Sequence, residues 1–431
     1  MSLRAAAALQ PFLLSYVKND MQAATPRRGA SRDLSLADRY RATRHLSEAL
    51  ATPLSDADAT IQSMPDASPA KWHLAHTTWF FETFLLRDHL SGYVRYDERW
   101  PFLFNSYYEA EGARHARAAR GLLSRPSLDE VLAWRRHVDE AMAPLLLRPE
   151  LASLVELGVQ HEQQHQELLL TDIKHGLWCN PLGPVYAPDP RPISTSEIPQ
   201  GWYEHPGGIA RIGHDGGGFG FDNEGPSHRV LLEPFGLSDR LVTNRDWDAF
   251  IADGGYASAA LWLSDGWAWV QREGVGAPLY WRDDEQFTLS GWRSRDPEAP
   301  VTHISFYEAD AFAAWAGHRL PTEFEWEAIG QAHDPQAGDQ LDHGGPVQPV
   351  TSQGLFGGCW QWTRSAYLPY PRFKPCDGAV GEYNGKFMSG QSVLKGASCA
   401  TPRGHSRASY RNFFYPHQRW QFTGLRLAKD I

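Results

Sequence analysis

The chain has 431 residues, of which 42% are hydrophobic and 21% charged, with a formal net charge of −10. This composition is typical of a globular protein with two domains and excludes disordered and fibrous proteins. The negative charge and the absence of a long Lys/Arg block argue against nucleic acid as a partner. The sequence contains no run of about 18 apolar residues, so no membrane span is predicted.

The cysteines indicate a reducing compartment. They form no Cys-x-x-Cys pair and no disulfide framework, and they stand at Cys179, Cys359, Cys376 and Cys399. A cytoplasmic location is therefore expected. Nothing in the sequence decides between a monomer and a homo-oligomer.

The first half of the chain carries a helical pattern. Residues 1–34 are polar and Arg-rich towards their end and are predicted to be weakly ordered. Apolar residues at three- and four-residue spacing then predict four helices, at residues 36–50, 68–90, 127–146 and 151–175. Their short connections predict an antiparallel four-helix bundle over residues 35–180, an architecture that builds metal sites from side chains on facing helices.

The composition of the sequence changes after the fourth predicted helix. Prolines crowd residues 181–200, which we interpret as a linker. Residues 201–431 contain short β-like runs broken by glycine. They also contain two capping-box signals, at Ser305 and Thr322, each of which predicts a helix. This half is predicted to be an α+β domain with long loops, so the chain combines an α domain and an α+β domain.

Two histidines on the fourth predicted helix indicate a metal site. His161 and His165 are four residues apart, which places them on one helix face at about 5–6 Å between Cβ atoms. The second predicted helix offers His73 or His76 as a third ligand. We predict His76, because it lies on the aromatic stripe that faces the bundle, and expect His73 to be solvated or adjacent to a ligand. Imidazole suits iron, zinc, copper or nickel, so the ligands alone do not name the metal.

The same stretch matches H-E-x-x-H, the motif of zinc proteases. In such an enzyme Glu162 would be the general base. The completing ligand is missing, however, because a metzincin has glycine and histidine where this chain has Leu168 and Thr171. The proline-rich segment that follows also leaves no helix to supply a glutamate. The sequence therefore argues against a protease.

From about residue 36 to residue 427 the chain resembles the sulfoxide synthases of ergothioneine biosynthesis. The resemblance rests on SPAKWHLAH at 68–76, HEQQHQE at 161–167, GHRLPTEFEW at 317–326, WQWT at 360–363, GASCATP at 396–402, RNFF at 411–414 and GLRL at 424–427. It implies a DinB-like four-helix bundle followed by an α+β domain. That second domain would be similar to formylglycine-generating enzymes and C-type lectins.

The resemblance also implies an activity. Members of this family hold a mononuclear non-haem Fe(II) and use O₂ as co-substrate, and the matching ligands here are His76, His161 and His165. They join a thiol sulfur to C2 of the imidazole of hercynine (Nα-trimethylhistidine) and form a sulfoxide. Tyr107 and Tyr108 match paired tyrosines of one subgroup, which are expected to donate a hydrogen bond or a proton.

Further positions follow from the same resemblance. Gln164 matches a residue on the hercynine side, Asn412 one that holds its carboxylate, and Phe413 an aromatic ring beside its trimethylammonium. Phe414 replaces an acidic residue of members that use γ-glutamylcysteine. Because an apolar ring cannot pair an ammonium, cysteine is the expected thiol.

Two arginines follow the tyrosine pair. Arg114 and Arg117 are candidates for binding the carboxylate of the thiol substrate, and solvated surface arginines are the alternative interpretation.

Three other functions stay open on the sequence. A relative of this subgroup joins a selenosugar to hercynine, so selenoneine synthesis is the first alternative. The second is a zinc-dependent DinB-like thiol transferase that works without O₂, and the third a non-enzymatic lectin-like binding module. Formylglycine generation is not expected, because Cys399 has no partner cysteine after it in the motif.

Overall fold

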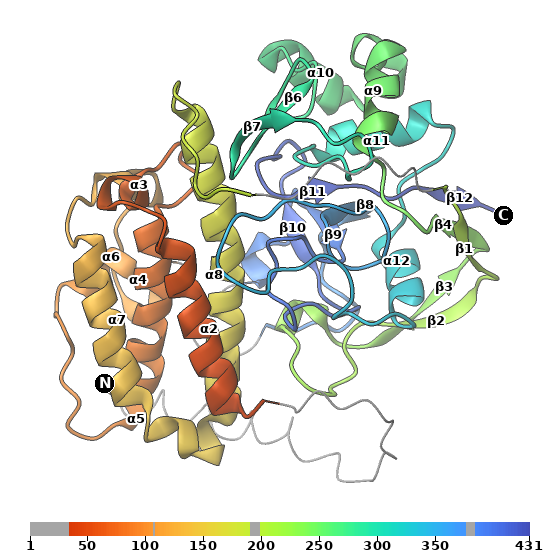
Figure 1. Cartoon of the computed structure of the whole chain (residues 1–431). Helices are drawn as coiled ribbons and strands as arrows, with labels where there is room; N and C mark the ends of the chain where they lie inside the picture. Colours follow the sequence, from red (N-terminus) through yellow and green to blue (C-terminus); the bar gives the residue numbers. More distant parts are fainter. Residues whose placement is uncertain (1–33, 107, 190–198, 376–383) are drawn as a thin grey trace.

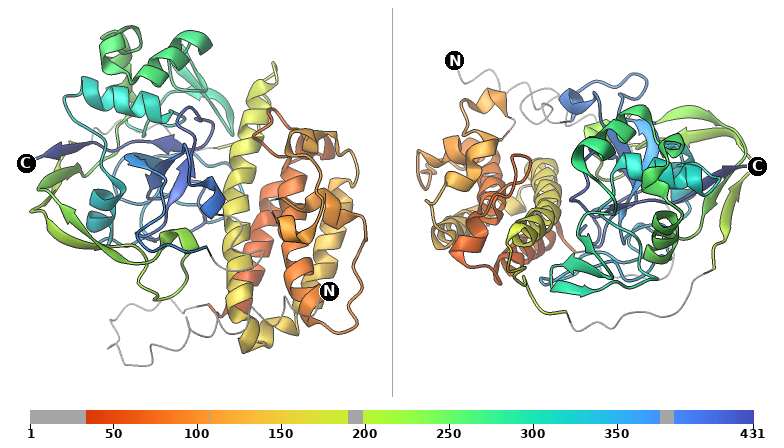
Figure 2. Two further views of the ribbon diagram at one scale, coloured as in Figure 1. Left: turned by 180° about the vertical axis from the view of Figure 1, so that it is seen from behind. Right: turned by 90° about the horizontal axis from the view of Figure 1, so that it is seen from above.

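The structure is a computed structural model that describes residues 34–106, 108–189, 199–375 and 384–431. A helical bundle and an α+β half lie side by side, and helix α8 runs along the border between them (Figures 1 and 2). The predicted weakly ordered segment falls almost wholly outside the described residues, as does the middle of the predicted linker. Within the described ranges, no helix combines the length and the hydropathy that crossing a bilayer requires.

The four long helices predicted from the sequence form the bundle. They are α2 (Leu36–Ala51), α4 (Ala70–Phe81), α7 (Leu128–Met142) and α8 (Ala152–Cys179). Helix α4 continues as a π-helical turn (Glu82–Leu86) and α5 (Arg87–His89). Two short helices, α3 (Asp56–Thr60) and α6 (Trp100–Phe104), occupy segments without a helical period in the sequence.

Local sequence explains where these helices begin and how closely they pack. Helix α7 starts at a capping box in which Ser127 and Glu130 satisfy each other's backbone amides. Every residue of α4 is buried, which makes it the central helix of the bundle. Gly158 of α8 lets the two helices approach, because a Cβ there would lie 2.5 Å from the Phe81 ring.

The second half is built from small sheets rather than one large sheet. Its strands are β1 (Trp202–His205), β2 (Gly208–Ile212), β3 (His228–Leu232), β4 (Phe235–Ser238), β5 (Trp281–Arg282), β6 (Glu285–Thr288), β7 (Gly291–Ser294), β8 (Trp360–Ala366), β9 (Ser392–Lys395), β10 (Asn412–Phe414), β11 (Thr423–Gly424) and β12 (Ala428–Asp430). The sheets have the orders β1-β4-β12, β10-β9-β8-β11 and β5-β6-β7, with a separate β2-β3 pair. The β11–β8 pair is parallel, and the other strand pairs are antiparallel.

Four helices accompany these strands. They are α9 (Asn244–Ala252), α10 (Ser264–Glu273), α11 (Phe306–Trp315) and α12 (Glu323–Gly330). The capping boxes at Ser305 and Thr322 are confirmed as the starts of α11 and α12. Helix α9 begins with the same device at Thr243, which the sequence analysis did not use.

One hydrophobic core spans the two halves, and two further cores lie within the second half. A single cluster of contacting buried residues runs from Trp79 and Phe80 of the bundle to Tyr280, Trp420 and Phe422 of the second half. Interfaces between domains of one chain are usually more polar than this. The halves are therefore joined through apolar packing as well as through the polar contacts of α8.

Glu167 makes the most extensive of these polar contacts. Its carboxylate accepts hydrogen bonds from the Trp360 indole at 2.7 Å, the Ser398 hydroxyl at 2.6 Å and the Thr401 hydroxyl at 2.7 Å. Desolvation at the interface raises the pKa of Glu167, while these three donors favour its ionised form. The contacts fix the face of α8 that meets the second half.

The bundle contains a buried ionic cluster around Glu162. Its carboxylate accepts from Arg44 Nη1 at 2.9 Å, from the Ser47 hydroxyl at 2.6 Å and from Arg135 Nη2. Burial alone would raise the pKa of Glu162, but Arg135 and Arg44 outweigh it and hold the pKa at about 2. The carboxylate that a zinc protease would use as its base is thus neutralised inside the bundle.

Replacing Glu162 with Gln should destabilise the protein strongly. The change removes the buried carboxylate that Arg44 and Arg135 share and leaves Arg44 paired with the less buried Asp139. Removing one partner of a buried ion pair costs about 3–5 kcal/mol. Chemical denaturation followed by circular dichroism measures this loss of unfolding free energy.

Glu156→Gln is the matched control on the same helix. Its partner Arg39 has a side chain that is 41% exposed, so this change should cost less than about 1 kcal/mol. Equal losses for the two variants would contradict a structural role for the buried cluster.

Candidate metal centre

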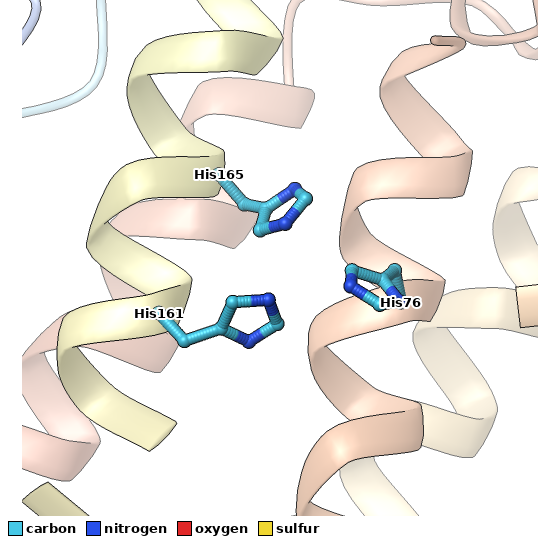
Figure 3. Close-up of side chains that lie close together, drawn as sticks. All are labelled: His76, His161 and His165. Carbon is cyan, nitrogen blue, oxygen red and sulfur yellow. The ribbon is translucent and has the colours of Figure 1, made fainter. Parts of the chain in front are cut away.

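Three histidines converge between α4 and α8 (Figure 3). His76 comes from α4, and His161 and His165 come from α8. One ring nitrogen from each lies within 4.8 Å of the other two. Imidazole nitrogens bound to one ion at about 2.1 Å are roughly 3–4 Å apart, so only a small closure separates this arrangement from coordination. The side chains predicted as ligands are thus brought together.

These histidines are neutral at physiological pH. Burial lowers the pKa of His161 to about 4. It also places the pKa values of His76 and His165 well below the ordinary range, and repulsion from His161 adds to the effect. Neutral imidazole is the form that binds metal, so the site needs little proton release on loading.

A backbone carbonyl orients His76. Its Nδ1–H donates to the carbonyl of Phe104 at 2.6 Å, the last residue of α6, which leaves the Nε2 lone pair for a ligand. The ring also stacks on Trp72 and Trp79, with centroids 4.6 and 5.5 Å away. The sequence predicts a loop at residues 91–123, and nothing in it indicates the hydrogen bond between His76 and Phe104.

His161 provides the test of whether an ion fits. Its Nδ1 is buried and has no hydrogen-bond partner among the described residues. The ring packs against Phe80, with centroids 5.1 Å apart. A buried imidazole nitrogen without a partner, next to two other imidazoles, suits a metal ion held by His76, His161 and His165.

His73 is buried beside His165, so the alternative of a solvated His73 is wrong. It is 3% exposed, and its Nδ1 lies 2.9 Å from the Nδ1 of His165. The partner of its other ring nitrogen is Asp172, at 3.1 Å.

Of the two tyrosines expected at the site, Tyr107 lies outside the described residues. Tyr108 is buried, and its ring centroid lies 5.4 Å from those of both Trp79 and Phe84. Since Trp79 stacks on His76, one aromatic ring separates Tyr108 from that histidine.

Gln164 belongs to a hydrogen-bond chain that the sequence did not suggest. Its Nε2 donates to the Tyr410 hydroxyl at 2.8 Å, and that oxygen lies 3.3 Å from His405 Nε2. His405 Nδ1 in turn lies 2.7 Å from Gln160 Oε1. Because an amide oxygen only accepts, His405 Nδ1 donates and its Nε2 accepts from Tyr410. These hydrogen bonds from Tyr410 and His405 of the second half orient the Gln164 amide.

Strand β10 holds two candidates for binding hercynine, Asn412 and Phe413, and also Phe414, the position that bears on the choice of thiol. Phe413 stacks on Tyr367 with centroids 4.1 Å apart. Phe414 approaches Trp420 at 6.4 Å, and Asn412 Oδ1 accepts from the Phe413 amide at 2.9 Å. Successive residues of a strand point to opposite faces, so the two phenylalanines diverge. In the described part of the chain, no ring contact or hydrogen bond joins Phe413 to the histidines.

A buried arginine that packs on Trp72, a ring stacked on His76, is one that the sequence analysis missed. Arg114 and Arg117 are exposed, and Arg117 donates to the Asp66 carbonyl. Arg120 is buried, with its guanidinium 3.3 Å from the Trp72 ring centroid and Nη1 2.9 Å from the Ser68 hydroxyl. Its three-residue spacing from Arg117 was the available signal.

Fold and site together define a two-domain protein in which a helical bundle carries a candidate three-histidine metal centre and an α+β half covers one side of it. Residues 39–169 match the DinB superfamily, and residues 199–345 match the Sulfatase-modifying factor enzyme 1-like domain.

Relatives match the chain along most of its length. It is 32% identical over 414 residues to the hercynine oxygenase of Mycolicibacterium smegmatis, an alignment that covers 87% of this chain and 94% of the relative. The hercynine oxygenase of Mycobacterium tuberculosis is 31% identical over 434 residues, covering 90% and 98%. The formylglycine-generating enzyme of Thermomonospora curvata is 35% identical over 188 residues, covering 38% and 60%. The chain belongs to the hercynine oxygenase family.

Replacing any one of the three histidines with Ala should reduce metal binding below detection at micromolar protein. Loss of one of three ligands removes a large part of the coordination energy. Anaerobic Fe(II) loading followed by elemental analysis gives the stoichiometry. His137→Ala, an exposed histidine of α7, is the control and should load like the wild type. Full loading of His76→Ala would show that the third ligand was misassigned.

Proposed function

We propose that the chain is a non-haem Fe(II) oxidoreductase that joins the sulfur of cysteine to C2 of the hercynine imidazole and forms a sulfoxide. The observation that carries this proposal is the convergence of three neutral histidines in a chain that aligns along its length with hercynine oxygenases. The proposal places the protein in the cytoplasm, in keeping with its cysteine usage.

The reaction balances with O₂ as the oxidant. The C2–H bond of hercynine and the S–H bond of the thiol break, and one C–S and one S–O bond form. The second oxygen atom leaves as water with both hydrogens. Carbon–sulfur coupling supplies two electrons and oxidation of sulfur supplies two more, which together reduce one O₂.

The proposed ion is held by His76, His161 and His165. When bound, Fe(II) supplies one-electron chemistry with O₂ and a positive charge for a thiolate. Neutral ligands leave that charge uncompensated, which favours an anionic sulfur at the site. The buried surroundings strengthen this attraction.

The protein's own groups have separate proposed roles. Gln164, with its Nε2 engaged by Tyr410, presents its amide oxygen as an acceptor for hercynine. Asn412 would bind the hercynine carboxylate, and Phe413 would attract the trimethylammonium by about 0.5–2 kcal/mol. Tyr107 and Tyr108 are the proposed proton donors, with Tyr108 packed within one ring of His76.

The chalcogen donor is the finer part of the proposal. Cysteine is favoured because Phe414 lies against Trp420 and offers no charge to a glutamyl ammonium. Arg114 and Arg117 are proposed for the cysteine carboxylate, and buried Arg120 joins them as a candidate. A selenosugar in place of cysteine is the alternative that the experiment has to separate.

Hercynine and cysteine together should cause O₂ uptake by the Fe(II)-loaded protein, with neither substrate sufficient alone. An oxygen electrode measures the uptake, and mass spectrometry identifies the product from cysteine, γ-glutamylcysteine and a selenosugar in parallel. A zinc-loaded sample is the control and should consume no O₂.

Each alternative leaves its own result in this assay. A product only from the selenosugar would replace the cysteine proposal with selenoneine synthesis. A thiol adduct formed by the zinc sample without O₂ would indicate a transferase. No product from any donor would leave a binding module.

Tyr108→Phe should lower the rate of sulfoxide formation by roughly 10²–10⁴-fold, the usual contribution of a general acid, and divert turnover towards oxidation of cysteine. Single-turnover product ratios measure both effects. Tyr186→Phe is the control, because its hydroxyl donates to the Leu50 carbonyl at 2.7 Å, and it should keep the wild-type ratio. An unchanged ratio in Tyr108→Phe would remove this residue from the chemistry.

A further inference from the structure

A continuous chain of hydrogen bonds connects one of the three histidines to the second half of the protein. His165 Nδ1 lies 2.9 Å from His73 Nδ1, and His73 Nε2 lies 3.1 Å from Asp172 Oδ2. The other carboxylate oxygen of Asp172 accepts from the indole N–H of Trp420 at 3.0 Å. His73, Asp172 and Trp420 are 3%, 6% and 8% exposed, so the two bonds to Asp172 are shielded from solvent, and His165 is half-buried.

The chemistry of the groups sets the direction of each bond. A carboxylate only accepts, so His73 Nε2 carries the hydrogen and donates it to Asp172. In a neutral imidazole the other nitrogen then accepts, so His73 Nδ1 receives the hydrogen of His165 Nδ1. The lone pair of His165 is therefore on Nε2.

We propose that Asp172, acting through His73, is a positioning residue that fixes the tautomer and ring orientation of His165 as a metal ligand, and that Trp420 holds Asp172 in place. The inference rests on the three-histidine site of the proposed function. The second half of the chain then influences the proposed metal centre through Trp420, which contacts none of the three histidines itself.

The carboxylate is firmly held. The Ser68 amide donates to Asp172 Oδ2 at 2.8 Å, just before the first turn of α4. Asp172 thus accepts three N–H groups that come from α4, from the segment before it and from the second half. Hydrogen bonds to an ionised acceptor are about twice as strong as neutral ones, and burial increases their strength.

The three proposed ligands differ in the hydrogen-bond partners of their rings. His76 donates to a neutral carbonyl, and His161 Nδ1 has no partner among the described residues. Among the described groups, His165 alone of the three is linked to a carboxylate. An imidazole that donates towards a carboxylate is a more basic ligand, and losing such a partner typically lowers metal affinity 10–100-fold.

The test measures Co(II) binding to the full chain by anaerobic titration, with the ligand-field spectrum as a second readout. His73→Phe keeps a ring but removes both hydrogen bonds, and Asp172→Asn removes the charge. Each should weaken Co(II) binding by about 10–100-fold and change the spectrum. Trp420→Phe, which removes only the indole N–H, should show a smaller loss in the same direction.

A conservative variant separates positioning from packing. His73→Asn places an amide oxygen near the position of the imidazole Nδ1, where it can accept from His165, and it should recover much of the affinity lost in His73→Phe. The control is Trp315→Phe, which removes an indole hydrogen bond to the carboxylate of Asp253, away from α8. It should leave Co(II) affinity and spectrum unchanged.

The outcomes are distinct. If the wild type binds Co(II) and His73→Phe and Asp172→Asn bind it with the same affinity and spectrum, the positioning role is wrong and the three-histidine site stands. Equal losses in His73→Phe and His73→Asn would also overturn it, because packing alone would then explain them. If the wild type binds no Co(II), the proposed function itself fails. Circular dichroism confirms that each variant is folded before it is titrated.

Discussion

A polar side chain that a helix carries into the interior costs free energy unless it finds a partner there. Helix α8 meets this constraint towards the bundle through Glu162 and two arginines, and towards the second half through Gln160 and Glu167. Glu162 and Gln160 lie about 100° to either side of His161 around the helix axis. Their contacts therefore fix the rotation of α8, and His161 and His165 are directed at α4 as a result.

The sequence indicated the three histidines that converge, but not the groups that orient them. Helical spacing identified His161 and His165, and the stripe facing the bundle selected His76. The carbonyl that orients His76 belongs to Phe104, and a backbone group has no signature in residue type. Trp420 and Asp172 are separated by 248 residues, so no local pattern could pair them.

Fold prediction succeeded where local signals were complete. Capping boxes and periodicity gave the four bundle helices and two helices of the second half. Strands β5 and β11 have two residues each, which is too short for an alternating pattern, and their pairing depends on tertiary contacts. The family resemblance named Phe413 and Phe414 as candidates. It did not indicate the face of the sheet to which each ring points, which the pleat of β10 decides.

An apolar core that crosses from Trp79 to Phe422 joins the bundle to the α+β half. A fragment cut in the linker would present these large rings to water on both pieces, and each piece would tend to self-associate. If the two halves were encoded as separate chains, the apolar residues at their contact would first have to be replaced by polar ones. The helical bundle is therefore not expected to be stable in isolation, even though its sequence matches a superfamily of its own.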